Sequence, residues 1–242
     1  MQTARRSDTP TLTEYDAAIR LNPDSADPYF NRAKAKRQDP SAITDYDEAI
    51  RLNPDFAEAY FYRGCLKDYL ARRESGLAAR HKARRAAIAD FDEAIRLNLD
   101  LDFRERLHAY YRRGLVKYDL DRYKDAIVDF DAALRLIKQG DPECLLAEIK
   151  ELPEEAIGML NFYEEGIAGI TERIRQNSNS ITDYKIRGET KGFLGRMQEA
   201  ESDFQKVLEL TTDTRVVIQI ERHLQELDNQ DYWQQYSWRT ER

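Results

Sequence analysis

The strongest constraint on the fold of this chain is a short motif that returns along its length. The segment 45–55, DYDEAIRLNPD, recurs as EYDAAIRLNPD, DFDEAIRLNLD, DFDAALRLI and DFQKVLEL, which begin at Glu14, Asp90, Asp129 and Asp203. A second motif, Tyr-x2-Arg-Gly/Ala-x2-Lys, precedes each of the complete copies and begins at Tyr29, Tyr60, Tyr110 and Tyr184. Repeats of a few tens of residues indicate a solenoid, in which each helix pair buries its apolar face on the next pair.

The two motifs resemble the tetratricopeptide repeat. In that family the first helix carries a large aromatic residue, an apolar residue, a small residue and a second aromatic, and the second helix carries Ala-x3-Phe. The best match places the first aromatic at Tyr110, the small residue at Gly114 and the start of Ala-x3-Phe at Ala126. The chain departs from the family at two places, because Arg113 replaces the apolar residue and Lys117 replaces the second aromatic.

The resemblance covers about residues 9–137 and 181–210. It implies an all-α fold, a right-handed solenoid of antiparallel helix pairs with a C-terminal capping helix. The predicted segments are a tail at 1–8, an array at 9–138 of half a repeat and three helix pairs, a divergent helical segment at 139–180, a repeat at 181–211, a capping helix at 212–229 and an aromatic tail at 230–242. Within the divergent segment we expect a helix break at Leu152–Pro153, because proline removes a backbone donor.

An insertion distinguishes the second complete repeat. Tyr60 to Ala87 spans 27 positions, whereas Tyr110 to Ala126 spans 16. The inserted stretch 71–86 predicts two helical extensions that turn at Ser75–Gly76 and form a basic spur. Its basic residues are Arg72, Arg73, Arg80, Lys82, Arg84 and Arg85. Such a spur can bind an acidic partner or nucleic acid, but it has no aromatic residue for base stacking, and a merely solvated helix is the alternative.

Charged residues recur at fixed places in the repeats. Each first helix carries an arginine four residues before a lysine, and each second helix carries an aspartate before its large aromatic. The expected ladder comprises Arg32, Arg63, Arg113 and Arg187 with Asp45, Asp90, Asp129 and Asp203. Because an unpaired buried charge is costly, we expect these arginines and aspartates to pair between helices. An anion-binding stripe is the alternative.

A second set of residues lies where the resemblance implies a ligand-binding groove along the first helices. The matching positions are Phe30, Lys34, Phe61, Cys65, Asp68, Tyr111, Arg112, Leu115 and Tyr118, followed by Lys185 and Glu189. These aromatic and charged residues suit a partner peptide or helix with apolar anchors. Packing of the aromatics on neighbouring repeats is the alternative.

No pattern typical of catalysis is present. The three histidines are scattered, and the glycine-rich, P-loop and H-E-x-x-H motifs are absent, so we expect neither an enzyme nor a cofactor or metal site. The two cysteines, Cys65 and Cys144, are too few for a disulfide framework. No apolar run approaches the length of a membrane span or secretory signal, so we expect a cytoplasmic protein without membrane insertion.

These features predict a non-enzymatic adaptor, scaffold or regulatory subunit that binds another protein in the groove. One alternative is a nucleic-acid-associated protein that uses the spur, although the net charge of -7 opposes this at long range. Another is an assembly module that self-associates through its half repeat, 9–21. The tail residues Trp233 and Trp238 are expected to pack on the capping helix or to occupy a groove as a competitor.

Overall fold

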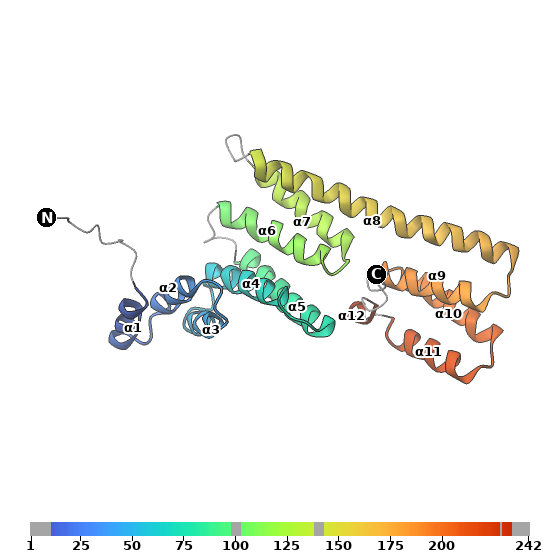
Figure 1. Ribbon diagram of the computed structural model, residues 1–242, viewed down its shortest axis with the longest axis horizontal. Coiled ribbons are helices and arrows are strands. Elements are labelled where there is room, and N and C mark those ends of the chain that lie inside the picture. The colour runs from blue at the N-terminus through green and yellow to red at the C-terminus, as the bar shows by residue number, and fades with distance from the viewer. Residues whose placement is uncertain (1–10, 98–102, 138–142, 228, 234–242) are drawn as a thin grey trace. The chain divides into compact units, whose positions relative to one another are not determined.

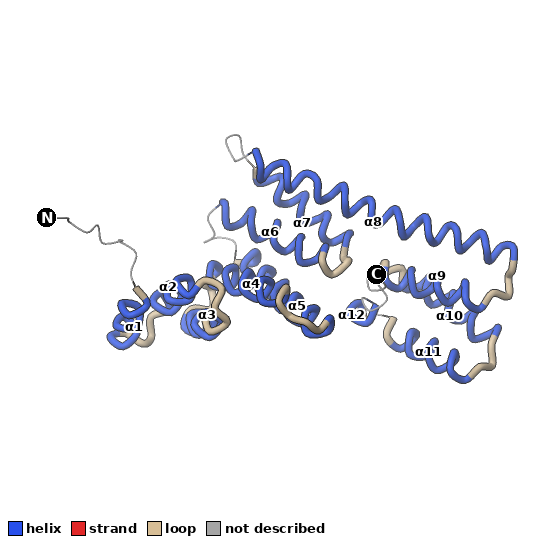
Figure 2. Tube along the Cα trace, in the orientation of Figure 1, coloured by secondary structure: helices blue, strands red, loops and turns tan. Residues whose placement is uncertain are grey.

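The computed structural model describes residues 11–97, 103–137, 143–227 and 229–233, and all regular secondary structure in these ranges is helical (Figure 1, Figure 2). The predicted all-α class is therefore confirmed for these ranges. The chain divides into two units: unit 1 holds residues 1–120 and 125–153, and unit 2 holds residues 121–124 and 154–242. The predicted tail at 1–8 and Trp238 lie outside the described residues.

Unit 1 is built from antiparallel helix pairs. Its helices are α1 (Leu12–Leu21), α2 (Ala26–Lys36), α3 (Ala42–Leu52), α4 (Ala57–Ala71), α5 (Leu77–Arg96), α6 (Phe103–Tyr118) and α7 (Tyr123–Leu136). Helix α2 packs on α3 and α4 packs on α5. Helices α6 and α7 pack through an apolar cluster that contains Leu107, Tyr111 and Phe130. These three pairs lie within the predicted array at 9–138.

In each of three helix pairs, a glycine of the first helix packs directly against an aromatic ring of the second. In the α6–α7 pair, a Cβ atom on Gly114 would lie 2.6 Å from the ring of Phe130. That ring is fully buried, as is the ring of Phe91 in the α4–α5 pair. A glycine at this position therefore allows the second helix to seat its aromatic ring at the density of a protein interior.

The basic spur is an extension of the α4–α5 pair. Helix α4 ends at Ala71 and α5 begins at Leu77, so the turn contains Ser75–Gly76, where the sequence predicted it. Arg84 of α5 donates to the Asp119 carboxylate at 2.7 Å and to the Asp119 carbonyl oxygen at 3.1 Å. These bonds fasten the first half of α5 to the end of α6.

Helix α8 (Glu143–Gln176) is continuous, and the predicted break at Leu152–Pro153 is wrong. The proline costs one backbone hydrogen bond. Buried residues at seven-residue intervals, Ile149, Ala156, Tyr163 and Ile170, form one apolar stripe on both sides of Pro153. Burial of this uninterrupted stripe is the physical reason that the helix continues, because packing outweighs the loss of a single bond.

Unit 2 contains the C-terminal part of α8 together with α9 (Ile181–Phe193), α10 (Met197–Leu210), α11 (Thr214–Gln225) and α12 (Gln230–Trp233). Helices α9 and α10 form the last complete repeat. Helix α11 lies within the predicted capping segment and packs on α10, with Ile220 and His223 buried.

The C-terminal helix α12 closes the core of unit 2. Trp233 is fully buried and stacks on Phe204, with ring centroids 5.7 Å apart and planes 8° apart. Its Nε1 donates to the carbonyl oxygen of Leu227 at 3.1 Å. Beside it, the Tyr232 hydroxyl lies 2.8 Å from Nδ1 of His223, and Nε2 of His223 lies 3.1 Å from Glu189. Both ring nitrogens of His223 therefore have a hydrogen-bond partner.

Replacing Trp233 tests the contribution of this C-terminal contact. Trp233→Ala should lower the free energy of unfolding of unit 2 by about 3–5 kcal/mol, because it removes a fully buried indole and leaves a cavity. Thermal unfolding and hydrogen exchange of the α10 and α11 amides would measure the change. Ile218→Ala truncates an exposed residue of α11 and is the matched control. Equal stability of the two variants would show that α12 does not stabilise the unit.

Candidate functional site

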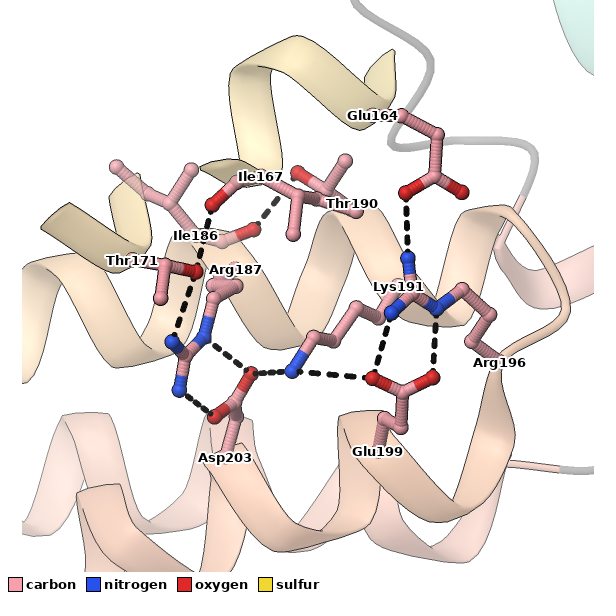
Figure 3. Close-up of polar contacts among 10 residues, drawn as sticks. All are labelled: Glu164, Ile167, Thr171, Ile186, Arg187, Thr190, Lys191, Arg196, Glu199 and Asp203. Carbon is pink, nitrogen blue, oxygen red and sulfur yellow. Dashed lines mark hydrogen bonds and ion pairs between the residues drawn. The ribbon is translucent and has the colours of Figure 1, made fainter. Parts of the chain in front are cut away.

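Ion pairs across each helix pair form the framework of the candidate site. In the α6–α7 pair, Arg113 donates to Asp129 from Nε at 2.9 Å and from Nη2 at 2.5 Å. Nζ of Lys117, one turn further along α6, lies 2.8 Å from the same carboxylate. The other pairs are Arg32 and Lys36 with Asp45, Arg63 and Lys67 with Asp90, and Arg187 and Lys191 with Asp203. The structure thus brings together all the arginines and aspartates of the expected ladder, and Figure 3 shows the last group.

Each aspartate of the ladder is shielded from water, and each arginine is partly shielded. The side chains of Asp129 and Arg113 are 1% and 15% exposed. Burial alone would raise the pKa of Asp45, but hydrogen bonds from Arg32 and Lys36 outweigh it and hold that pKa below its ordinary value. The carboxylates therefore neutralise the cations of the ladder, which favours a structural role over the alternative of an anion-binding stripe.

The same arginines also reach the second helix of the preceding repeat. Nη1 of Arg63 lies 2.6 Å from Asp47, sixteen residues earlier in the chain. Arg32 makes the equivalent contact with Asp16 at 2.7 Å, also across sixteen residues. In unit 2 the partner of Arg187 is the hydroxyl of Thr171 at 3.0 Å, again sixteen residues earlier (Figure 3). Arg113 lies 2.6 Å from Asp92, 21 residues earlier. Every ladder arginine therefore joins its own repeat to the helix before it.

The predicted groove residues divide into core and surface positions. Phe30, Phe61 and Tyr111 are only 5%, 7% and 6% exposed. Phe30 packs against Phe56, with ring centroids 4.6 Å apart, and the Phe61 ring lies 6.1 Å from that of Phe91. These rings belong to the contacts between helices, so the structure supports the packing alternative for them.

The remaining groove residues differ in their exposure, and therefore in their accessibility to a binding partner. Lys34 and Arg112 are exposed, whereas Cys65, Leu115 and Tyr118 are half-buried. Asp68 is 3% exposed and accepts a hydrogen bond from Arg72 at 2.9 Å, so it does not lie on the groove surface. Further along, Lys185 donates to Gln219 of α11 at 2.8 Å and Glu189 contacts His223. The capping helix thus engages both of these positions.

A pocket of about 330 Å³ lies between α2, α4 and α6 in unit 1. Its cations are Lys34, Arg37 and Arg112, and its aromatic residues are Tyr46, Tyr62 and Tyr69. The Nζ atom of Lys34 lies 4.6 Å from the ring centroid of Tyr62 and 5.0 Å from that of Phe30. The pocket therefore combines positive charge with aromatic surface.

Tyr62 and Tyr69 are not among the groove residues that the sequence predicts, because those residues place Phe61 on the groove face of α4. The positions 58, 62, 65 and 69 follow the helical spacing of four, three and four residues and so share a face. Cys65 was already assigned to the groove, and this spacing identifies Tyr62 and Tyr69 as its neighbours on that face.

The chemistry of the pocket is that of binding groups rather than reactive groups. Burial raises the pKa of the Cys65 thiol to about 12, so the thiol stays protonated and is a poor nucleophile at neutral pH. Burial, together with the nearby carboxylate of Glu105, raises the pKa of Tyr62 to about 12. At the start of α4, burial and the adjacent Glu105 also raise the pKa of Glu58. Glu58 and Glu105 therefore place two carboxyl groups at this end of the groove, and burial together with their mutual repulsion disfavours the charged form of Glu58.

The basic spur presents fewer available cations than the sequence indicated. Arg72 binds Asp68, Arg84 binds Asp119, and Arg80 donates to the carbonyl oxygen of Glu74 at 3.0 Å. Arg85 also has interactions of its own. Arg73 and Lys82 are exposed, and Arg73 donates to the hydroxyl of Tyr69 at 2.6 Å. Several spur cations therefore take part in contacts within the fold.

The half repeat leaves apolar surface uncovered. None of the residues of α1 is buried, and its Leu12 and Leu21 are 44% and 87% exposed. Self-association through this helix stays a prediction.

Within the described residues, no group of three or more His, Cys, Asp or Glu side chains could hold a metal ion. Among the same residues, no helix has both the length and the apolar character that crossing a membrane requires. The expectations that the chain is not an enzyme and that it is cytoplasmic stay predictions.

Comparison with known proteins identifies the repeats. A family model described as TPR repeat matches residues 36–66, and one described as Tetratricopeptide repeat matches residues 107–139 and 186–214. No curated protein sequence matches the chain significantly. These residues of the chain are therefore tetratricopeptide repeats, and the all-helical fold that the sequence predicted is the fold of the described residues.

Several solved structures are similar to this chain. YrrB, described as a TPR protein with an unusual peptide-binding site, is 18% identical, and the match covers 88% of this chain and 100% of YrrB with a TM-score of 0.48. TTC0263 of Thermus thermophilus, a thermophilic TPR protein, is 16% identical over 88% of this chain and 89% of its own, with a TM-score of 0.43. The structure of MamA from Desulfovibrio magneticus RS-1, which runs from residue 41 to the end of that protein, is 19% identical. The match covers 78% of this chain and 97% of the MamA chain, with a TM-score of 0.43.

Substitution of one ladder arginine tests the framework. Arg113→Met should lower the free energy of unfolding by about 3 kcal/mol, because the buried Asp129 keeps only Lys117 as a cationic partner. Urea unfolding followed by circular dichroism measures this loss. Arg51→Met is the matched control, since Arg51 is 64% exposed and pairs with Glu48 within one helix; it should change stability by less than about 1 kcal/mol. Equal effects of the two substitutions would contradict the structural role of the ladder.

The lowered pKa of Asp45 predicts a loss of stability in acid. Because this pKa is lower in the folded than in the unfolded chain, the ion pair contributes stability that is fully present above the unfolded value of about 3.9. That contribution is lost as the pH falls through the lower, folded pKa. The free energy of unfolding, measured with urea at a series of pH values below about 5, should therefore depend less on pH for Asp45→Asn than for wild type. Asp24→Asn, at an exposed residue between α1 and α2, should keep the wild-type dependence.

Proposed function

We propose that this chain is a non-enzymatic adaptor that holds a peptide segment of a partner protein in the groove of unit 1. The observation that carries the proposal is the pocket between α2, α4 and α6, in which Lys34, Arg37 and Arg112 surround tyrosine rings. Tetratricopeptide repeats expose such surfaces along their first helices, and large side chains in a groove supply most of the binding energy of a bound peptide.

The chemistry of this pocket favours a peptide with an acidic residue next to an apolar or aromatic anchor. Carboxylates bind guanidinium groups with strong, directional hydrogen bonds. The exposed Arg112 offers such a group, since no ion pair of its side chain occurs within the described residues. The tyrosine rings of the pocket offer flat apolar area for the anchor. The whole chain is acidic, so the pocket would be a local exception to its net charge of -7.

The occupation of the pocket is tested by charge reversal at exposed positions. Lys34→Glu combined with Arg112→Glu should weaken partner binding on the order of tenfold or more, because it replaces attraction with repulsion while leaving the core intact. Affinity capture from a lysate of the source cells, with and without nuclease, identifies proteins that bind wild type and not this variant. Isothermal titration calorimetry with a peptide from such a protein then measures the loss.

The matched control reverses charge on the spur through Arg80→Glu and Lys82→Glu, because neither side chain lines the pocket and Arg80 donates to the carbonyl oxygen of Glu74 within the spur. This control should retain the partner. Loss of the bound material with the spur variant and with nuclease treatment, but not with the pocket variant, would make the chain a nucleic-acid-associated protein and overturn the proposal. Phe61 and Tyr111 are unsuitable for this test because their burial makes any loss of binding indistinguishable from a loss of fold.

A further inference from the structure

The contact between Arg187 and Thr171 fixes the place of α8 in the repeat pattern. Arg32 and Arg63 reach sixteen residues back to Asp16 and Asp47, which lie on the second helix of the preceding repeat. Arg187 reaches sixteen residues back to Thr171 of α8. Thr171 therefore occupies the position of Asp47, and the C-terminal part of α8 corresponds to the second helix of a repeat.

When α8 is aligned with the other second helices through Thr171 and Asp47, two glycines of α8 fall where those helices carry buried residues. Two residues before Thr171 is Gly169, which corresponds to the ladder aspartates, and five residues before it is Gly166, which corresponds to an alanine. The corresponding alanines, Ala42, Ala87, Ala126 and Ala200, are all fully buried beneath the first helices of their own repeats. Gly166 and Gly169 are exposed instead, and a Cβ atom on either one would meet nothing within 4 Å.

Gly166 and Gly169 are exposed because α8 is one continuous helix. In a complete repeat, the residues before the second helix turn back and form a first helix against it. Here α8 is one helix from Glu143 to Gln176, so no first helix folds back onto Gly166 within unit 2. The pattern of the repeats thus predicts an uncovered surface at this position, between α8 and α9.

A pocket of about 380 Å³ lies at that surface. Its apolar lining comes from Phe162, Tyr163 and Ile170 of α8 and from Ile186 of α9. Phe162 is 62% exposed, which is unusual for a phenylalanine beside an apolar pocket. The pocket adjoins both the second helix of its own repeat and the first helix of the next, which are the two neighbours that a first helix would contact.

We propose that a helix of a partner protein binds along α8 and α9 and takes the place of the absent first helix. The glycines allow its backbone to approach α8 closely, as Gly114 allows the approach of Phe130 within a complete repeat. Apolar residues of the partner helix cover Phe162 and Ile170. Because Gly169 offers no carboxylate, the partner helix carries an apolar residue where the first helices of this chain carry their ladder arginine.

The charge around the pocket specifies a basic partner helix. Glu165 lines the pocket, and Glu155 lies two helical turns before Phe162 on the same face of α8. Both glutamates are exposed, and neither forms an ion pair within the part of the chain that the structure describes. Arg173 also lines the pocket, but Asp183 binds its guanidinium at 2.7 Å and offsets its charge. An amphipathic helix with lysines or arginines beside its apolar face therefore complements this surface.

The test uses a peptide of defined sequence and the chain of 242 residues. The probe is a fluorescently labelled peptide with the sequence of residues 103–118, a basic first helix, carrying the change Arg113→Leu. Fluorescence anisotropy should show saturable binding with a dissociation constant on the order of 10–100 μM. The same peptide with its native arginine should bind at least about tenfold more weakly, because its guanidinium would be buried opposite Gly169 without a carboxylate.

Variants of the chain locate the binding site. Gly166→Leu should reduce binding of the probe by about tenfold or more, because the leucine fills the surface where the helix approaches, while its Cβ atom meets no atom of the fold within 4 Å. Ala168→Leu is the matched control, since Ala168 is exposed on α8 outside the pocket, and it should bind like wild type. The pair Lys34→Glu and Arg112→Glu should also leave binding of this probe unchanged, which separates this site from the groove of unit 1.

Three outcomes would overturn the proposal. The first is the absence of saturable binding of the probe up to about 1 mM. The second is equal binding to Gly166→Leu and Ala168→Leu. The third comes from sedimentation equilibrium: a wild-type dimer that Gly166→Leu converts to a monomer would identify a second copy of this chain, and not a partner helix, as the occupant.

Discussion

The buried aspartate at the centre of each helix pair is the interaction on which the rest of this structure depends. It lies beneath the first helix of its repeat, where an unpaired carboxylate would be strongly unfavourable, and it is neutralised by an arginine and a lysine one turn apart. The arginine also contacts the helix of the preceding repeat, as Arg63 does with Asp47. One side chain thus specifies both the pairing of helices within a repeat and the stacking of one repeat on the next. In α8 the aspartate is replaced by Gly169, which removes the electrostatic need for a first helix at that place.

The fold and the ladder could be predicted from the sequence because both depend on spacing. A helix places residues four apart on one face, so the recurring arginine and lysine had to face one partner, and the aspartate on the second helix was the recurrent candidate. The groove was harder to predict. Phe61 and Tyr62 are adjacent, and the recurring motif does not distinguish which of the two rings enters the core. Only the spacing from Cys65 places Tyr62, and not Phe61, on the groove face of α4.

The predicted break at Pro153 failed for a related reason. The preference of proline is local, whereas the apolar stripe that continues from Ile149 to Ile170 acts over several turns and opposes it. The surface beside Gly166 could not be foreseen for the same reason, since it exists only because α8 is one continuous helix. The aromatic tail is an intermediate case. Its tryptophan was expected to pack on the capping helix, and the structure adds that Trp233 also stacks on Phe204, an aromatic ring of a repeat.

The extended turn between α4 and α5 shows how little the length of a connection matters to this architecture. The ladder partners Arg63 and Asp90 are 27 residues apart, whereas Arg113 and Asp129 are 16 apart, yet both make the same pair of hydrogen bonds. The entropy of closing a loop grows only with the logarithm of its length, so the longer connection costs about 0.5 kcal/mol more. Turns between paired helices are therefore places where a chain of this kind can gain residues, and with them new surface, without weakening the contacts that define its fold.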